Sequence, residues 1–272
     1  MQLKTRLLPP NVEHGDVLQD GQTYNIFDTH LFYQNKDTDA HNNKVFHKQT
    51  QSDEHTIQSI DEFSPMLTPD MREERILKLQ TESSTNTNNL ATTLRLKVGT
   101  KVEISTNIDT EDGLFNNSLA EVYSFSMTND NVTTVNLKFQ RDDVGRKWMA
   151  DNFNKSARQD PFIVNIPRKT LGFYMTKPYP KVTRTQFPLR PNSAITFNRA
   201  QGRTIPKGVV DLLPAPNAGM HYVALSRSPN LSSISIVNLD EKKIQSEQIS
   251  TYRNEQTKDH KKIDSLVVQT HR

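Results

Sequence analysis

The sequence predicts an α/β protein with a parallel sheet, joined to a β-rich region in the middle of the chain. After Pro191, apolar strand-like runs alternate with turns and a short apolar helix, which is the order typical of a parallel sheet. Between residues 94 and 139, short stretches alternate apolar with polar side chains and are separated by turn signals. Hydrophobic residues make up 33% of the chain, which allows a core but leaves a polar excess to loops and a tail.

The N-terminal part of the chain predicts helices mixed with short strands. Residues 1–28 combine two adjacent prolines with polar residues and favour a short helix followed by a loop. The apolar run at 30–33 predicts a buried strand, and residues 36–48 predict a helix with few apolar positions. Residues 56–60 predict another strand, and residues 71–79 another helix.

Short strands dominate the middle of the chain. The turns between them contain Asp112-Gly113 and Asn129-Asp130, pairs that favour tight connections. A spacing of roughly 8–12 residues between strands is typical of a small barrel or sandwich. The expected strands are LRLKV at 94–98, KVEIS at 101–105, AEVYSFS at 120–126 and VTTVNLKF at 132–139, with 161–167 and 182–187 as the last ones.

The C-terminal part returns to a strand–turn–helix order. Its densely charged end, residues 241–272, predicts a solvated or weakly helical tail. Before that tail, the expected elements are a strand at 193–197, a turn or short helix at 198–205, a strand at 208–213, a helix at 219–227 and a final strand at 234–239.

Composition excludes several kinds of chemistry. The chain contains no cysteine, so disulfides, thiolate zinc sites, thiol catalysis and iron–sulfur clusters are excluded. The formal net charge of +3 is too small to indicate nucleic-acid binding without a local basic groove. No apolar run reaches the roughly 18–20 residues that span a bilayer, and the first residues lack the apolar stretch of a signal peptide. We therefore expect an intracellular protein with no membrane partner.

The sequence contains no phosphate-binding loop of its own. None of its nine glycines is followed directly by lysine, which excludes G-x-x-x-x-G-K-[ST], and no G-x-G-x-x-G is present. Ile60-Asp61-Glu62 has the outline of a Walker B end. The residues before it are half polar, however, so we interpret it as an ordinary strand end.

Other polar clusters favour structural interpretations. His41, His47 and His55 could suggest a metal cluster, but their spacings place no two on one helical face. We therefore expect surface histidines and no metal site. The carboxylates of DTEDG at 109–113 have the chemistry of a turn, in which Gly113 supplies a positive φ.

Two segments near the C-terminus carry the strongest functional signal. Residues 194–212 place a polar turn with Asn198 and Arg199 between two apolar strands, at the sheet edge where α/β proteins bind ligands. HYVALSR at 221–227 predicts a short apolar helix that ends in Arg227, whose charge also favours its own helix dipole. The residues alone leave the functional and the structural interpretation open.

The same two segments resemble motifs of a known family. AITFNRAQGRT at 194–204 resembles motif V, and HYVALSR resembles motif VI, of the superfamily-one DNA helicases of the Pif and RecD type, which include those carried by Helitron transposons. Because each motif alone is short, the resemblance depends on their combination in family order along roughly residues 30–240. Three further similar runs are HLFYQNKDTDAHNNKVF at 30–46, LRLKVGTKVEISTNIDTEDGLFNNS at 94–118 and RTQFPLRPNSAIT at 184–196.

The resemblance implies a RecA-like α/β lobe of the P-loop NTPase type, a second helicase lobe interrupted by a small β-barrel-like insert. The first part of this lobe would be residues 1–65 and the insert residues 66–185. The second part, with motifs V and VI, would be residues 186–240, followed by the tail at 241–272. The family's other RecA-like lobe, which holds Walker A and Walker B, has no counterpart in this sequence, so the chain looks like the C-terminal half of a helicase.

The resemblance also implies an ATP-dependent DNA helicase activity, with functions in DNA repair, recombination and telomere maintenance. ATP and Mg²⁺ would bind between two lobes, and the partners would be single-stranded DNA and an N-terminal Walker A lobe supplied elsewhere. Family analogy places such a protein in the nucleus or in mitochondria. The implied site residues are Arg227 as an arginine finger, Gln201, Gly202 and Thr204 on the nucleotide side, and Thr196, Asn198 and Arg199 on the DNA side.

Some residues depart from the family pattern. Arg199 and Ala200 stand where motif V most often has Lys and Ser, and Asn117 stands where a glycine is frequent. Without a Walker A loop we expect no appreciable ATP hydrolysis by the chain alone. An inactive remnant that binds single-stranded DNA, or a non-enzymatic interaction protein, is therefore the alternative. Three basic residues of the insert are candidates for guiding the DNA strand: Arg95, Lys97 and Lys101. An exposed face of alternating β-strands explains their positions better.

Overall fold

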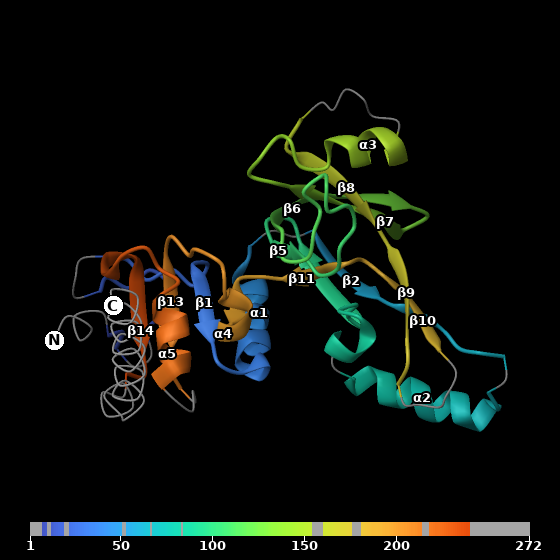
Figure 1. Ribbon diagram of the computed structural model, residues 1–272, viewed down its shortest axis with the longest axis horizontal. Coiled ribbons are helices and arrows are strands. Elements are labelled where there is room, and N and C mark those ends of the chain that lie inside the picture. Colours follow the sequence, from blue (N-terminus) through green and yellow to red (C-terminus); the bar gives the residue numbers. More distant parts are fainter. Residues whose placement is uncertain are drawn as a thin grey trace, which may run out of the picture. The chain divides into compact units, whose positions relative to one another are not determined.

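The chain divides into two compact units (Figure 1). The flanking unit combines Met1–Asn43 with Ala194–Arg272, and the inserted unit is Lys44–Ser193. The charged tail predicted at 241–272 lies outside the described residues. The computed structural model describes residues 7–9, 12–18, 22–50, 53–65, 67–82, 84–153, 160–175, 181–213 and 218–239.

A parallel sheet forms the centre of the flanking unit. Each pair of neighbouring strands is parallel, and their apolar side chains are buried, as is typical of parallel strands. The sheet confirms the predicted α/β class and the strands expected near 30–33, 193–197, 208–213 and 234–239. In spatial order its strands are β12 (Ala194–Thr196), β1 (Thr29–Phe32), β13 (Gly208–Asp211) and β14 (Ile234–Val237).

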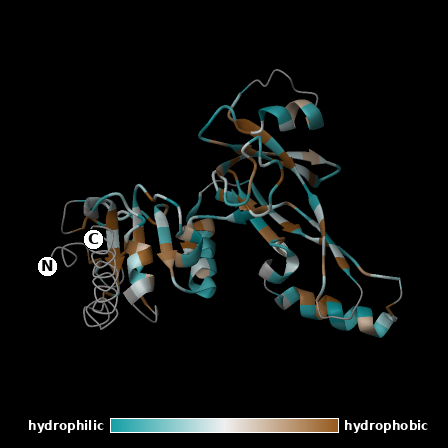
Figure 2. Cartoon of the chain, in the orientation of Figure 1, coloured by the Kyte–Doolittle hydropathy of each residue, from teal (hydrophilic) through white to brown (hydrophobic). Residues whose placement is uncertain are grey.

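Helices follow three of these strands. They are α1 (Asn35–Lys48) after β1, α4 (Phe197–Ala200) after β12 and α5 (Ala218–Leu225) after β13. A 3₁₀ turn, η3 (Leu231–Ser233), precedes β14. Asp37 in the first turn of α1 and His47 in its last turn favour the helix dipole. Apolar residues concentrate in the strands, whereas α1 is largely hydrophilic (Figure 2). None of the helices in the described residues is long and apolar enough to cross a membrane.

The segment before β1 differs from the predicted short helix. Its described residues form an antiparallel bridge between Val17 and Thr23 and a parallel bridge between Leu7 and Ile236. The second bridge places Leu7 beside Ile236 of β14, which lies 229 positions later in the sequence. Among the described residues of this segment, bridges of this kind stand where the sequence predicts a helix and a loop.

Antiparallel strands build the inserted unit (Figure 1). The largest sheet has the order β11 (Leu189–Pro191), β5 (Lys101–Ile104), β6 (Leu119–Thr128), β7 (Asn131–Lys138) and β8 (Ile163–Pro167). The smaller sheets are β2 (Glu54–Gln58) with β4 (Thr93–Lys97), and β3 (Ile60–Glu62) with β10 (Val182–Gln186) and β9 (Lys169–Phe173). The helices are α2 (Pro69–Thr81), α3 (Arg146–Phe153) and the 3₁₀ turn η2 (Ser84–Thr87).

Local turn chemistry in this unit follows the sequence. Asn129 and Asp130 both have a positive φ and connect β6 to β7, which is the geometry of a type I′ hairpin turn. Gly113 has a φ of 79° at the predicted DTEDG turn. Asn117, which stands where the related motif often has glycine, adopts a φ of 75°, since asparagine tolerates this left-handed conformation.

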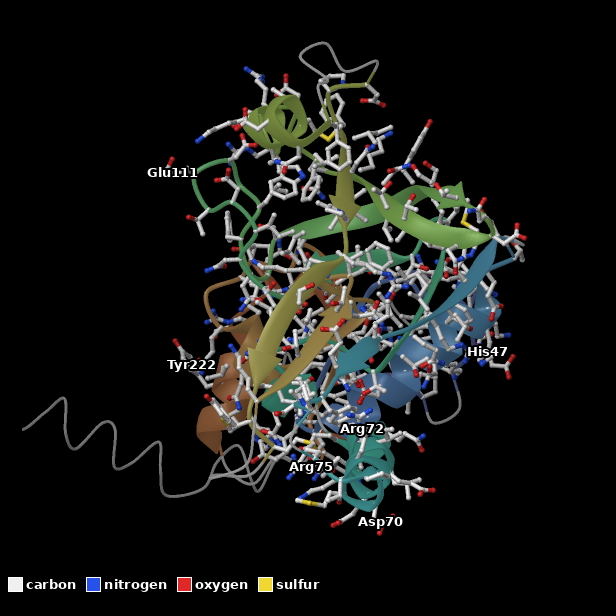
Figure 3. All side chains as sticks on the ribbon, turned by 90° about the vertical axis from the view of Figure 1, so that its right-hand side faces the viewer. His47, Asp70, Arg72, Arg75, Glu111 and Tyr222 are labelled. Atoms are coloured by element: carbon white, nitrogen blue, oxygen red, sulfur yellow. The ribbon has the colours of Figure 1, made fainter. Side chains whose placement is uncertain are left out.

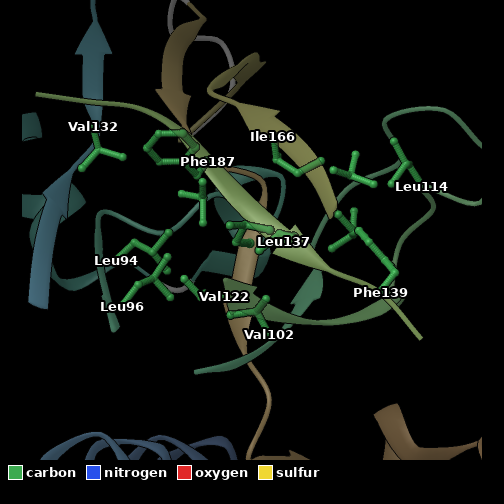
Figure 4. Packing of buried hydrophobic residues seen from close by; sticks show 14 of the residues in the cluster. Leu94, Leu96, Val102, Leu114, Val122, Val132, Leu137, Phe139, Ile166 and Phe187 are labelled. Carbon is green, nitrogen blue, oxygen red and sulfur yellow. The ribbon is translucent and has the colours of Figure 1, made fainter. Parts of the chain in front are cut away.

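A large hydrophobic core packs the inserted unit (Figure 4), and a smaller cluster contains Leu79, Phe173 and Val182. Full burial of an apolar side chain contributes about 1.5–3 kcal/mol to the free energy of unfolding. Among the described residues, the two end strands of the large sheet, β11 and β8, do not pair with each other, so the sheet is open and the predicted barrel is not confirmed. The core includes Leu94, Leu96, Val102, Leu114, Val122, Leu137, Ile166 and Phe187.

The two units divide after residues 43 and 193, whereas the sequence predicts boundaries after residues 65 and 185. The difference arises because β2 pairs with β4 and β3 pairs with β10, which places residues 54–62 in the inserted unit. Ile57 lies opposite Leu94 and joins the core of this unit. Sheet pairing with distant strands therefore sets the boundary.

A buried ion pair joins β3 to β10. Arg184 is fully buried, and its Nε and Nη2 donate to the two carboxylate oxygens of Asp61, each over 2.7 Å. Its Nη1 donates to the carbonyl oxygen of Leu90 and to Oγ1 of Thr92, at 3.1 and 3.0 Å. The Asp61 carboxylate is thus engaged within the fold, which agrees with an ordinary strand residue rather than a Walker B end.

We expect Arg184→Met to destabilise the inserted unit strongly, because it leaves the Asp61 carboxylate without its partner in a mostly buried position. Loss of one member of a buried pair costs about 3–5 kcal/mol of unfolding free energy. Urea unfolding followed by the fluorescence of Trp148, the only tryptophan, measures this change. The control is Arg141→Met, because the Arg141–Asp143 pair is exposed. Equal midpoints for the two variants would contradict the prediction.

Candidate functional site

The polar run singled out in the sequence lies in a turn that leaves the edge strand of the parallel sheet. β12 ends at Thr196, and the single-turn helix α4 follows directly. Phe197 and Ala200, three residues apart, are fully buried in the core of the flanking unit. Asn198 is exposed and Arg199 is half-buried, because they point away from that core.

The chain reverses at Gly202, just after α4. The backbone N–H of Gln201 donates to the carbonyl oxygen of Asn198 at 3.3 Å and ends the helix. Gly202 has a φ of 76°, and a Cβ at this position would meet nothing within 4 Å. Glycine is therefore favoured by the backbone conformation and not by crowding. Gln201, Gly202 and Thr204 are all exposed, so the turn presents an open polar surface.

Thr196 differs from the other predicted site residues because it is only 7% exposed. It occupies the N-cap position of α4, where its side chain makes no capping hydrogen bond. The predicted DNA side thus separates into Asn198 and Arg199, which reach the surface of the flanking unit, and Thr196, which is buried at the end of the strand. The alternation of a three-residue strand gives too little pattern to predict this burial.

Arg227 lies beside the polar turn, because its backbone carbonyl oxygen accepts the N–H of Ile205 at 2.9 Å. Its guanidinium is half-buried. Nε donates to the carbonyl oxygen of Val223 at 2.9 Å, and Nη2 donates to Oγ of Ser226 at 2.8 Å. The bond to Val223 gives a carbonyl group at the end of α5 a hydrogen-bond partner. In this geometry Arg227 therefore has the structural role that the sequence also allows, which is to stabilise the end of its own helix. The same fold pairs the Arg227 backbone with Ile205, the residue after Thr204.

Helix α5 is fixed by a residue that the sequence did not single out. His221 is buried, and its Nε2 lies 3.1 Å from the carbonyl oxygen of Leu212, at the end of β13. Tyr222, which follows it, is 73% exposed and projects away from α5 (Figure 3). The bond from His221 anchors the start of α5 to the sheet, and this anchoring sets the position of Arg227 at the other end.

A buried cluster of rings supports β1. The rings of His30 and His41 stack with centroids 3.8 Å apart. Nδ1 of His30 donates to the carbonyl oxygen of Asp28 at 2.8 Å, so its Nε2 accepts the hydroxyl of Tyr24 at 2.9 Å. Nε2 of His41 donates to the carbonyl oxygen of Ile26 at 3.2 Å. Burial, and then the charge of Asp28, raise the pKa of Tyr24, which keeps this hydroxyl protonated as a donor.

The predicted surface position is wrong for His41, which is only 9% exposed. Its ring is enclosed by His30 and Phe32, two residues of β1. His47 is exposed on α1 (Figure 3), and the side chain of His55 is 21% exposed. In the part of the chain that the structure describes, no group of three or more His, Cys, Asp or Glu is placed to hold a metal ion.

Two basic residues of the inserted unit, Lys97 and Arg95, make contacts that stabilise the fold. Lys97 is 8% exposed, and its Nζ donates to the carbonyl oxygen of Phe46 at 3.1 Å and lies 3.5 Å from Oε2 of Glu54. The guanidinium of Arg95 stacks over the Phe46 ring at 4.4 Å and pairs with Glu54. Both stabilise the end of α1, where positive charge is favourable. Lys97 is therefore not on an exposed strand face, whereas Lys101 is exposed at the start of β5.

In the flanking unit, parallel strands alternate with helices, and an open polar turn follows the edge strand. These features define an α/β lobe of the kind that binds ligands at its sheet edge.

Comparison with known proteins shows which proteins the chain resembles. The chain is 35% identical over 106 residues to the ATP-dependent DNA helicase RRM3 of Saccharomyces cerevisiae, a match that covers 39% of this chain and 12% of RRM3. No family model matches the chain.

Solved structures show the same fold. The crystal structure of the Pif1 helicase from Candida albicans matches with a TM-score of 0.61 and 21% identity, over 93% of this chain and 52% of that chain. The crystal structure of a Bacteroides Pif1 helicase in complex with ADP-AlF3 and single-stranded DNA matches with a TM-score of 0.55 and 17% identity, over 87% and 47%. The predicted RecA-like fold is thus confirmed.

The chain is similar to Pif-type DNA helicases over part of their length. It spans about half of each of these solved chains and 12% of RRM3. The resemblance found in the sequence and the likeness of fold therefore agree, and both concern a part of the larger proteins.

We expect Gly202→Ala to lower the free energy of unfolding by about 1 kcal/mol, because a positive φ costs an L-residue about 1–2 kcal/mol. Gly202→Asn should lose less, since asparagine adopts this conformation more readily. Thermal unfolding followed by far-UV circular dichroism measures both variants. An alanine variant as stable as the natural protein would show that the turn relaxes to a negative φ.

Proposed function

We propose that the chain is the C-terminal motor lobe of a Pif-type, ATP-dependent DNA helicase. The flanking unit would contact single-stranded DNA and supply an arginine finger to ATP held by a separate lobe with a Walker A motif. The observation that carries this proposal is the open turn at 198–204, which follows the edge strand and lies beside Arg227. Relatives that resemble the chain in sequence and fold are named as DNA helicases.

On the DNA side, Asn198 and Arg199 are the residues placed to contact the phosphate backbone. An exposed amide and a half-buried guanidinium can donate to phosphate oxygens without reading the bases, which suits a motor that moves along any sequence. Thr196 would act from its buried position by fixing the end of β12. The Bacteroides Pif1 structure contains single-stranded DNA, which supports this class of ligand.

On the nucleotide side, Gln201, Gly202 and Thr204 would line one wall of an ATP site. Their exposure and the absence of a side chain at Gly202 leave room for phosphates to approach the backbone. Arg227 would stabilise charge on the γ-phosphate by exchanging its bonds to Val223 and Ser226 for phosphate oxygens. When bound, ATP supplies the phosphate bond to be hydrolysed, and Mg²⁺ neutralises part of its charge.

These residues fit one side of an ATP site only. The sequence has no Walker A motif, so no group in it is suited to hold the β- and γ-phosphates. Turnover would require a second lobe with that motif, supplied by another segment or another polypeptide. Nuclear or mitochondrial placement, and functions in repair, recombination or telomere maintenance, belong to the same proposal.

An inactive remnant that binds single-stranded DNA is the second candidate. Two observations favour it: the sequence lacks a Walker A motif, and the Arg227 guanidinium donates to its own helix. A chain that binds single-stranded DNA and fails to support turnover with any added Walker A lobe would be such a remnant. A chain that binds no DNA would be an interaction protein that keeps only the fold.

We expect the purified chain to bind fluorescent oligo(dT) with an affinity that falls as salt rises, because phosphate contacts release counterions. Arg199→Ala should weaken binding about threefold to tenfold and reduce the salt slope by about 0.7, the value for one contact on single strands. Fluorescence anisotropy at several salt concentrations measures both quantities. Arg141→Ala, at an exposed arginine of the inserted unit, is the control. Equal slopes for both variants would exclude Arg199 from the DNA side.

We expect Arg227→Ala to reduce ATP turnover about 10³-fold in a mixture of the chain with a Walker A lobe from a Pif-type relative. DNA binding should stay within about twofold, because Arg227 is not on the proposed DNA side. Arg227→Lys controls for the loss of positive charge at the end of α5. Parallel loss of turnover and DNA binding in the alanine variant would indicate a structural role instead of an arginine finger.

A further inference from the structure

β12 is the edge strand of the parallel sheet in the part of the chain that the structure describes. It has three residues and pairs with β1 along one side. The outer side of an edge strand presents backbone N–H and C=O groups, and these groups need partners once the strand is buried. All three residues of β12 are buried, so water cannot readily serve as that partner.

Asn42, on helix α1, supplies both partners for Ala194. Its Oδ1 accepts the backbone N–H of Ala194 at 2.9 Å, and its Nδ2 donates to the carbonyl oxygen of Ala194 at 3.3 Å. The two residues are 152 positions apart, so this pair of bonds ties α1 directly to the edge strand. The Asn42 amide therefore takes the place that a further strand would have.

The amide side chain of Asn42 matches both groups of Ala194. It offers one acceptor and two donors on a short planar group, whereas an ionised aspartate offers acceptors only and a leucine of similar size offers neither. Aspartate would keep a partner for the N–H of Ala194 but would set a carboxylate oxygen against its carbonyl oxygen. These differences allow the two bonds to be tested separately.

The clamped residue lies just before the proposed site. Ala194 is two residues before Thr196, which ends the strand and begins the turn with Asn198 and Arg199. We propose that Asn42 is a positioning residue, which holds the edge strand so that this turn presents Asn198 and Arg199 to single-stranded DNA. The DNA part of this inference rests on the proposed function, whereas the clamp itself rests on the hydrogen bonds alone.

Amide hydrogen exchange of the full chain, followed by NMR, tests the clamp. In Asn42→Leu the Ala194 amide loses its acceptor and should exchange about tenfold faster. In Asn42→Asp this amide should stay protected. Two amides serve as references, because each donates to a backbone carbonyl oxygen away from β12: Leu212 in the flanking unit and Ile104 in the inserted unit. Asn43→Leu, at the exposed neighbouring position, is the matched control.

Binding of oligo(dT) tests the positioning role on the same variants. Asn42→Leu should weaken binding about threefold to tenfold, and Asn43→Leu should leave it unchanged. A merely structural role would change the exchange of Leu212 and Ile104 by the same factor as that of Ala194. It would also leave the affinity of the folded fraction unaltered.

The clamp and the positioning role can be overturned separately. Unchanged protection of the Ala194 amide in Asn42→Leu, or equal loss at Leu212, would show that Asn42 does not hold the edge strand. Local loss of protection with unaltered oligo(dT) affinity would show that the clamp does not position the DNA side. Failure of the natural chain to bind oligo(dT) would overturn the proposed function, and with it the positioning role. The exchange data would then decide on the clamp alone.

Discussion

Arg184 carries a full charge while it is withdrawn from water, and this constraint organises the inserted unit. A buried guanidinium is stable only where its donors find acceptors, and four hydrogen bonds meet that need here. The acceptors come from Asp61 on β3 and from Leu90 and Thr92 before β4, so one side chain of β10 connects its own strand to two other stretches of chain. The strands that pack the core are thereby held in one arrangement, which places Leu94 and Phe187 in the same cluster.

The residues behind the resemblance to Pif-type helicases divide into two kinds. In the run at 184–192 the side chains have packing roles: Gln186 donates to two backbone carbonyl oxygens, and Asn192 donates to the buried carboxylate of Glu103. The fold alone accounts for those residue types. The turn at 198–204 is different, because most of its polar side chains are exposed. This contrast is the reason for placing the proposed site on the turn rather than on the longer similar runs.

Local patterns in the sequence predict the strands and turns well, because alternation and turn residues act over a few positions. Side chains that depend on distant partners escape such patterns. His41 is buried by rings of β1, Lys97 is buried against the end of α1, and Asn42 finds its partner 152 positions later. The unit boundaries differ for the same reason, since pairing of β2 and β3 with distant strands decides them. Of the candidate site, the exposed turn and its neighbour Arg227 follow from motif order, while the burial of Thr196 does not.

In the function proposed above, this chain would be one half of a motor that contacts single-stranded DNA and depends on a separate Walker A lobe to hold the phosphates of ATP. The most direct test is steady-state ATP hydrolysis by the purified chain alone, with and without oligo(dT), in a preparation whose DNA binding is measured in parallel. The account predicts DNA binding without turnover above the buffer background in either condition. Turnover stimulated by oligo(dT) would contradict it, because the sequence would then contain a complete nucleotide site despite its lack of a Walker A motif.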